Sequence, residues 1–310
     1  MIVVAIPAVA LAIISLAAFL GQWVWWLDVL ANFRAQYVVV LAFLGLVVLM
    51  SKWRKIGYTV LAVALVNLVA VLPLYVGSPA EVSLEAPSMR VLSFNLLSTN
   101  ESYAEVIEYI ETVDPELVLL HEASRPWEVA MESSDLDYQI IRPRSDDLIF
   151  GTLVLVRGED VAAVSYGFSS SSPRAVELTF TPPGWTAELA VLGTHPLAPT
   201  DEDRAELRDA QLAFAGQWAS GQTGAYAVVG DFNSTPWSWP FRRLMSSAEL
   251  INSQSGFGLQ PTFSTESNLL LRVPIDHLVH SPALEVTDRQ LGPDLGSDHF
   301  PLLVDVQLAG

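Results

Sequence analysis

The sequence predicts an α/β domain that follows a membrane region of three transmembrane helices. Of its 310 residues, 51% are hydrophobic, the mean hydropathy is +0.39, and the apolar excess is concentrated at the N-terminal end. After position 88, strand-like and helix-like segments alternate, without internal repeats or low-complexity tracts. We therefore expect a transmembrane region at 1–77, a Pro/Ser/Glu-containing linker at 78–88 and one sizeable α/β domain at 89–310.

Three apolar blocks, near 2–22, 35–51 and 56–76, define the predicted membrane spans. The first charged residue of the chain is Asp28, and the other two blocks contain none. Each block reaches or approaches the ~20 residues that a helix needs to cross a bilayer, the middle one being the shortest.

Two other interpretations of these blocks fit less well. A cleaved signal peptide would begin with basic residues, but the chain begins Met1-Ile2-Val3-Val4 and two further apolar blocks follow. A helical core of a soluble domain would need a polar outer face, and these blocks have almost no polar residues. The pattern favours membrane spans.

The basic residues of the connections predict the orientation. The second connection, SKWRK at 51–55, holds three basic residues, whereas the first holds Arg34, offset by Asp28. Since basic loops stay in the cytoplasm, we expect a multi-pass cell-membrane protein with a cytoplasmic N-terminus and an extracytoplasmic domain. The tryptophans of QWVWW at 22–26 would then lie at the outer interface.

The exported part is strongly acidic. Only four of the 16 basic and one of the 34 acidic residues lie in the first 80 positions, which leaves the other 230 with a net charge of about −21. This charge either disfavours a long polyanion such as duplex DNA or is a solubility adaptation. The absence of cysteine excludes disulfides and thiol chemistry.

The domain is predicted to begin strand, helix, strand. RVLSFNL at 90–96 and ELVLLHE at 116–122 are strand-like, and the segment at 100–113 carries a helical apolar stripe. A second helix is expected over 201–219, starting at three acidic residues. Further strands are expected at 148–156, 162–168, 175–181, 186–194, 225–231, 273–279 and 301–307.

Polar side chains end or flank these apolar strands: Asn95, Glu122, His195, Asp231, Asn233, Asp276, His277, Asp298 and His299. Active sites of α/β proteins gather at strand ends. In VVGDFNSTPWS at 228–238, a strand continuing past Asp231 would point Asp231 and Asn233 to the same face. Singly, each residue also has a structural explanation, such as turn formation, an ion pair or a packed histidine.

As an ordered set, the elements SFNL, LLHE, GTHP, GDFNSTP, IDHL and SDHFP resemble the endonuclease/exonuclease/phosphatase superfamily. They extend from 89 to about 307, with weaker agreement in GTLVLVR, RDAQL and PTF. The resemblance implies a DNase I-like, four-layer fold, a two-sheet sandwich flanked by helices.

The resemblance also implies a Mg²⁺ site, for which Mn²⁺ could substitute. Glu122 would be the main ligand, helped by Asn95 and Asp298. Oxygen ligands of this kind suit Mg²⁺, which would polarise the phosphoryl oxygens and stabilise the leaving oxygen.

The remaining matched residues would be catalytic. Asp231 would deprotonate the attacking water, Asn233 would donate to the charge on phosphorus, and His195 would be a general acid or phosphate contact. His299 would contact the phosphate or help activate water, oriented by Asp276. His121 stands where the family often has Gln, and we expect it, His277 and His280 to be structural.

The prediction is a membrane-anchored, metal-dependent phosphoesterase or phosphodiesterase. Its substrate is left open among nucleic acid, a phospholipid headgroup and a small phosphodiester, because one fold and site serve all of these in the superfamily. The alternative is a catalytically silent, membrane-tethered binding module on the same fold. The expected partners are the substrate and the bilayer, with no obligate protein partner evident.

Overall fold

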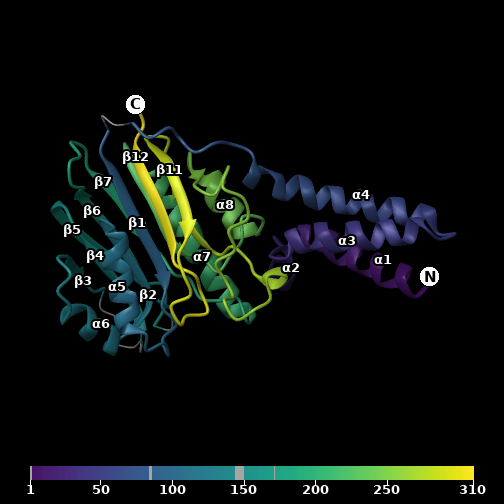
Figure 1. Ribbon diagram of the computed structural model, residues 1–310, viewed down its shortest axis with the longest axis horizontal. Coiled ribbons are helices and arrows are strands. Elements are labelled where there is room, and N and C mark those ends of the chain that lie inside the picture. Colours follow the sequence, from purple (N-terminus) through teal and green to yellow (C-terminus); the bar gives the residue numbers. More distant parts are fainter. Residues whose placement is uncertain (1, 84–85, 144–149, 171) are drawn as a thin grey trace.

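The computed structural model describes residues 2–83, 86–143, 150–170 and 172–310. A bundle of apolar helices projects from an α/β domain (Figure 1). The N-terminus lies at the end of the bundle far from the domain, whereas the C-terminus lies on the domain (Figure 1). The helical elements of the bundle are α1 (Ile2–Ala17), η1 (Ala18–Leu20), α2 (Trp25–Ala31), α3 (Arg34–Leu49), α4 (Arg54–Val71) and η2 (Leu72–Tyr75).

Two of these helical segments, Val3–Leu20 and Arg54–Tyr75, are long and apolar enough to cross a membrane by themselves. A third span results only if α2 and α3, which are bent by 68° at the break between them, count as one. The expected middle span therefore corresponds to a bent pair, in which α2 is a separate short helix beside the domain (Figure 1).

A polar cluster joins the three long helices. The guanidinium of Arg34 donates to Asn67 Oδ1 at 2.9 Å, and Asn67 Nδ2 donates to Ser15 Oγ at 3.2 Å. All three side chains are buried. Polar groups in an apolar bundle are costly unless they are paired, so this cluster fixes how the helices pack.

Two six-stranded sheets form the centre of the domain. The first has the order β11 (Leu284–Leu291), β12 (Leu302–Leu308), β1 (Ser88–Asn95), β2 (Leu117–Ser124), β4 (Phe150–Val156), β3 (Gln139–Ile141). The second has the order β5 (Glu159–Tyr166), β6 (Ala175–Thr181), β7 (Leu189–Gly193), β8 (Ala225–Asp231), β10 (Asp276–His280), β9 (Ile251–Asn252). The pairs β1–β2 and β7–β8 are parallel.

Alternating side chains of the strands build three apolar layers. Leu119 and Val191 belong to the core between the sheets. Leu120, one residue along, belongs to the layer under α5 (Tyr103–Val113) and α6 (Arg125–Glu132). Leu192 belongs to the layer under α7 (Glu202–Ser220) and α8 (Trp239–Ser247). This arrangement confirms the predicted two-sheet sandwich flanked by helices.

The predicted boundaries of the helices and strands match the structure closely in some segments and less closely in others. The helix at 201–219 is α7, whose first turn is capped by Asp201 accepting from the Arg204 N–H at 2.9 Å. The strand at 162–168 starts earlier, since Gly158 at φ +156° turns β4 directly into β5. The strand at 273–279 starts later, at Asp276, because Val273 pairs with Phe263 instead. The first two residues of the strand at 148–156 lie outside the described residues.

The short helix α2 lies against the α/β domain. The Arg208 guanidinium of α7 donates to Asp28 Oδ2 at 2.9 Å, and both side chains are buried. Asn32, just after α2, accepts hydrogen bonds from Thr235 and Ser238, each at 3.0 Å. The bundle of apolar helices is thus joined to α7 and to the loop that follows β8.

Candidate active site

The end of β8 is shaped by a glycine and a turn. Gly230 has φ +143°, and a Cβ there would lie 2.0 Å from the carbonyl oxygen of Thr194, so only glycine fits. The strand ends at Asp231, and Asn233 has φ +48°. The Asn233 N–H donates to Asp231 Oδ1 at 2.8 Å. A turn, rather than the strand alternation we expected, therefore brings the two residues together.

The side-chain amide of Asn233 reaches across to the next loop. Its Nδ2 donates to the Pro196 carbonyl at 3.0 Å, while a longer contact of 3.4 Å joins it to Asp231 Oδ2. Pro196 follows His195, which stands just after β7. Asn233 thus ties the His195 loop to the end of β8, and its amide is partly engaged in this structural contact.

Asn95 and Glu122 come from the parallel strands β1 and β2. The register of β2 shifts between Leu120 and Ala123, and Glu122 sits in that bulge with φ +54°. Asn95 Nδ2 donates to Glu122 Oε1 at 3.2 Å and to Asp231 Oδ2 at 3.1 Å. The Glu122 side chain is 22% exposed, so this carboxylate is partly accessible to solvent while Asp231 is buried.

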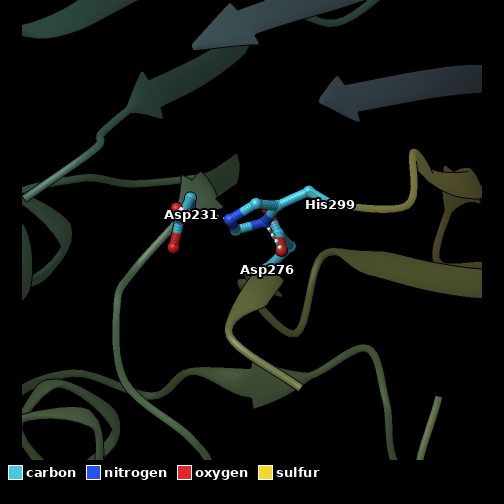
Figure 2. Close-up of side chains that lie close together, drawn as sticks. All are labelled: Asp231, Asp276 and His299. Atoms are coloured by element: carbon cyan, nitrogen blue, oxygen red, sulfur yellow. Dashed lines mark hydrogen bonds and ion pairs between the residues drawn. The ribbon is translucent and has the colours of Figure 1, made fainter. Parts of the chain in front are cut away.

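Asp276 and His299 form a buried pair opposite Asp231. Nδ1 of His299 lies 2.8 Å from Asp276 Oδ2, and its Nε2 lies 3.7 Å from Asp231 Oδ2 (Figure 2). Burial opposes protonation of His299, but the charges of Asp276 and Asp231 outweigh it and raise its pKa to about 9. Burial also opposes ionisation of Asp276, yet the charge and hydrogen bond of His299 lower its pKa.

Asp231 lies between two histidines. His195 Nε2 is 3.6 Å from Asp231 Oδ2, the same oxygen that His299 Nε2 approaches at 3.7 Å. Burial, followed by the charge of Asp276, raises the pKa of Asp231 to about 6, against the opposing effect of both histidines. A carboxylate with a pKa near neutrality accepts and releases a proton readily, which suits a general base.

His121 lies beneath the site. Its ring is buried, with Nδ1 3.1 Å from Thr152 Oγ1 and Nε2 3.4 Å from Ser93 Oγ, and its centroid lies 5.4 Å from that of His195. Burial lowers its pKa to about 3, so it is neutral at physiological pH. His277 and His280 are also buried, and both bond backbone carbonyls.

Sequence reasoning missed Arg289, which packs against the Asp276–His299 pair. It is buried on β11, where its Nη2 donates to the Asp276 carbonyl at 3.3 Å and its Nε to Ser253 Oγ at 3.2 Å. We did not predict β11, because its charged residues alternate irregularly around a bulge between Val286 and Asp288. In the sequence, Arg289 stands out only as a basic residue within this irregular edge strand.

The donor set fits a hard divalent cation. Glu122, Asn95 and Asp298 offer only oxygen or amide groups, and burial raises the pKa of Asp298, which the charge of Glu122 raises further. The Asn95 nitrogen faces the two carboxylates while its Oδ1 accepts from the Leu97 N–H at 3.1 Å. A 180° turn of this amide would present its oxygen toward Glu122, which suits a cation between them.

A second set of ligand-type atoms also lies in the site. Atoms of Asp231, Asp276 and His299 are all within 4.8 Å of one another. Because Asp276 already binds Nδ1 of His299, this set leaves fewer atoms free to coordinate a metal ion than the set around Glu122. This set is therefore less suited to a cation than the one around Glu122.

Comparisons with known proteins agree with this architecture. A humanized D. rerio TDP2 with 14 mutations matches with a TM-score of 0.58 and 16% identity, over 71% of this chain and 98% of that one. An endonuclease/exonuclease/phosphatase family protein from Bacteroides thetaiotaomicron matches with a TM-score of 0.56 and 18% identity, over 73% and 100%. ANGEL2, a 2′,3′-cyclic phosphatase, matches with a TM-score of 0.57 and 14% identity, over 75% and 99%. At these identities the likeness establishes the fold.

A search among curated protein sequences gives no match. The sequence model of the Endonuclease/Exonuclease/phosphatase family, however, matches residues 92–299, more than half of the chain. These residues include every polar position at which the strand ends converge, from Asn95 to His299. The protein is therefore a member of the endonuclease/exonuclease/phosphatase family.

Proposed function

We propose that this protein is a metal-dependent phosphoester hydrolase, anchored in the cell membrane with its catalytic domain outside the cytoplasm. The observation that carries the proposal is the convergence of Asp231, Asp276 and His299 beside Asn95 and Glu122. Among the described residues, none of these carboxylates is paired with a lysine or arginine. An acidic cluster whose carboxylates form no ion pair with a lysine or arginine is suited to recruit a metal cation.

In the proposed mechanism, Asp231 takes a proton from the attacking water. The new P–O bond forms as the ester P–O bond breaks, and His195, whose Nε2 lies 3.9 Å from Glu122 Oε1, donates a proton to the leaving oxygen. His299, protonated at neutral pH and oriented by Asp276, faces the charge that develops on the phosphoryl group. Bound Mg²⁺ or Mn²⁺, held by Glu122 with Asn95 and Asp298, would supply Lewis-acid stabilisation of the phosphoryl and leaving oxygens.

Hydrolysis of bis(p-nitrophenyl) phosphate by the full chain in detergent tests this proposal. We expect turnover with Mg²⁺ or Mn²⁺ that falls about 10²-fold or more in Asp231→Asn and Glu122→Gln. Glu111→Gln, on the exposed face of α5, is the matched control and should keep wild-type turnover. Unchanged turnover in both site variants would refute the assignment. Absence of metal binding by calorimetry would favour the silent binding module instead.

The proposed topology has residues 1–77 in the membrane, a linker at 78–88 and the domain at 89–310. Its support is that the N-terminus lies at the end of the bundle opposite the domain, where the chain also passes from α3 to α4 through the basic segment 51–55 (Figure 1).

The chain has no cysteine, so single cysteines can report the topology. In intact cells, an impermeant maleimide should label Glu249→Cys on the domain and leave Lys52→Cys unlabelled. The reverse pattern would place the domain in the cytoplasm.

A further inference from the structure

Three consecutive leucines of the catalytic domain project into solvent. Leu269, Leu270 and Leu271 form the short helix η3 and are 66%, 63% and 59% exposed. Isolated exposed leucines are ordinary, but a run of three on a surface loop marks a site of interaction. The Nε2 of Gln36, on α3, donates to the carbonyl of Arg272 at 2.9 Å, so this loop is held beside the membrane helices.

An apolar groove lies between this loop and the membrane helices. Its volume is about 460 Å³, and its walls include Ala35 and Val39 of α3, Leu68 of α4, and Leu259 and Leu270 of the domain. The helix walls belong to segments that are apolar enough to cross a membrane. Val39 is 57% and Leu68 is 41% exposed, so the groove is continuous with the surface that faces lipid. Its natural occupant is therefore a hydrocarbon chain from the bilayer.

The groove sits at the end of the bundle nearest the domain. Tyr75, which also lines it, is 57% exposed, and Trp23 and Trp26 near α2 are 70% and 53% exposed. Exposed aromatic residues of this kind gather where the hydrocarbon meets water. The groove and the leucines therefore lie where a lipid headgroup joins its chain.

Two short segments lead from the groove into the active site. Leu259 and Pro261 line the groove, and two residues on, the ring of Phe263 lies 4.9 Å from that of His299. On the other side, the Arg272 guanidinium donates to the Thr265 carbonyl at 2.9 Å, and the Thr265 N–H donates to the carbonyl of Asp298, also at 2.9 Å. A molecule with its chain in the groove would have its polar end beside the catalytic histidine.

We propose that the groove binds the hydrocarbon chain of a membrane-resident phosphate ester, whose phosphate is the substrate of the adjacent site. This inference rests on the proposed function and narrows its substrate class to lipids. The groove selects the alcohol part of the ester, while the residues around Asp231 act on the phosphate. A long polyanion such as duplex DNA has no hydrocarbon chain that could occupy this groove.

The test compares two p-nitrophenyl phosphodiesters that release the same leaving group, one with a methyl and one with a hexadecyl ester, using the full chain in phosphatidylcholine nanodiscs. Wild-type protein should prefer the hexadecyl ester by at least about tenfold in kcat/KM. Ala35→Phe, which fills the groove, and Leu270→Ser should reduce hexadecyl turnover about tenfold or more and leave methyl turnover within about twofold.

Ala10→Phe is the matched control. Together with Ile6 and Trp53, Ala10 lines another apolar hollow of the bundle. This hollow involves α1 and the connection from α3 to α4, in the part of the bundle that projects away from the domain (Figure 1). The same substitution there should leave both rates unchanged. Equal hexadecyl rates in wild type and Ala35→Phe, or an equal loss of hexadecyl turnover in Ala10→Phe, would overturn the proposal that this groove binds the hydrocarbon chain. No hydrolysis of either ester by wild-type protein would instead refute the proposed function.

Discussion

The loop from Phe232 to Ser238 joins two buried charged clusters of different character. On one side, Asp28 is bonded by the guanidinium of Arg208, which also contacts Asp209 at 2.8 Å. On the other side, the carboxylates of Asp231 and Asp276 form ion pairs only with histidine side chains among the described residues, while Arg289 bonds the backbone carbonyl of Asp276. Arginine stays charged under all physiological conditions, whereas histidine titrates.

The difference separates a fixed structural contact from a cluster that can exchange protons. A carboxylate held by a permanent cation keeps one charge and one geometry, so the Asp28–Arg208 pair fixes α2 on the domain. Carboxylates held by histidines exchange protons with them, and burial raises the pKa of Asp231 to about 6. The variants below test this contrast, beginning with the largest expected effect.

Asp276→Asn should cost the most activity. The neutral amide no longer favours protonated His299, whose pKa then falls, and it allows the ring to turn. We expect kcat for bis(p-nitrophenyl) phosphate to fall about 10²–10⁴-fold with little change in Tm. Asp288→Asn, exposed on β11, is the control. A kcat within about threefold of wild type would mean that the pair is structural, like the Asp28–Arg208 pair.

Arg208→Met should cost the most stability. It leaves the buried Asp28 carboxylate without its partner, which costs about 3–5 kcal/mol. Asp28→Asn in the same chain removes the stranded charge and still accepts the Trp239 N–H, so the double variant should recover most of the loss. Thermal unfolding of the full chain in detergent measures both. Equal Tm values for the single and double variants would contradict a charge-pair fastening.

His277→Gln should make stability less sensitive to acid. Burial lowers the pKa of His277 to about 3, while its ordinary value is 6.5. Below pH 6.5 the unfolded chain therefore binds a proton that the folded chain does not, and stability is lost as pH falls from 6.5 toward 3. At pH 5 this amounts to about 2 kcal/mol for one such histidine. Tm measured from pH 7 to pH 5 should fall less steeply in the variant, and parallel curves would exclude this role.

The sequence predicted the cluster around Asp231 better than the Asp28–Arg208 contact. Asn95 and Glu122 lie at the ends of the parallel strands β1 and β2, and Asp231 ends β8. Asp276 and His299 instead stand at or before the starts of β10 and β12, which run antiparallel to β8 and β1. Strand order, the Glu122 bulge and the left-handed turn at Asn233 depend on tertiary packing and are not visible in any local pattern.

The Asp28–Arg208 contact lacks a local signal altogether. Asp28 and Arg208 are 180 positions apart in sequence, and each taken alone has the pattern of an ordinary surface charge. We treated Asp28 only as a charge that offsets Arg34 in a loop. Its burial follows from the 68° bend between α2 and α3, which turns the short helix onto the domain instead of continuing the span.

Trp237→Phe should have the smallest effect and tests whether the two clusters are linked. The indole Nε1 donates to the Ala70 carbonyl of α4 at 3.0 Å, and the ring packs against Val71 and Leu74. Phenylalanine keeps most of the packing and loses one hydrogen bond, so we expect the free energy of unfolding to fall by about 1 kcal/mol and Tm by about 2–4 °C.

Because Trp237 lies in the loop that begins after Asp231, kcat is the informative second measurement for Trp237→Phe. A loop that only fastens the helices predicts an unchanged kcat with the lower Tm. A fall in kcat larger than about threefold would instead mean that the apolar helices hold Asp231 and Asn233 in their active arrangement. The two clusters would then differ in chemistry and still depend on each other.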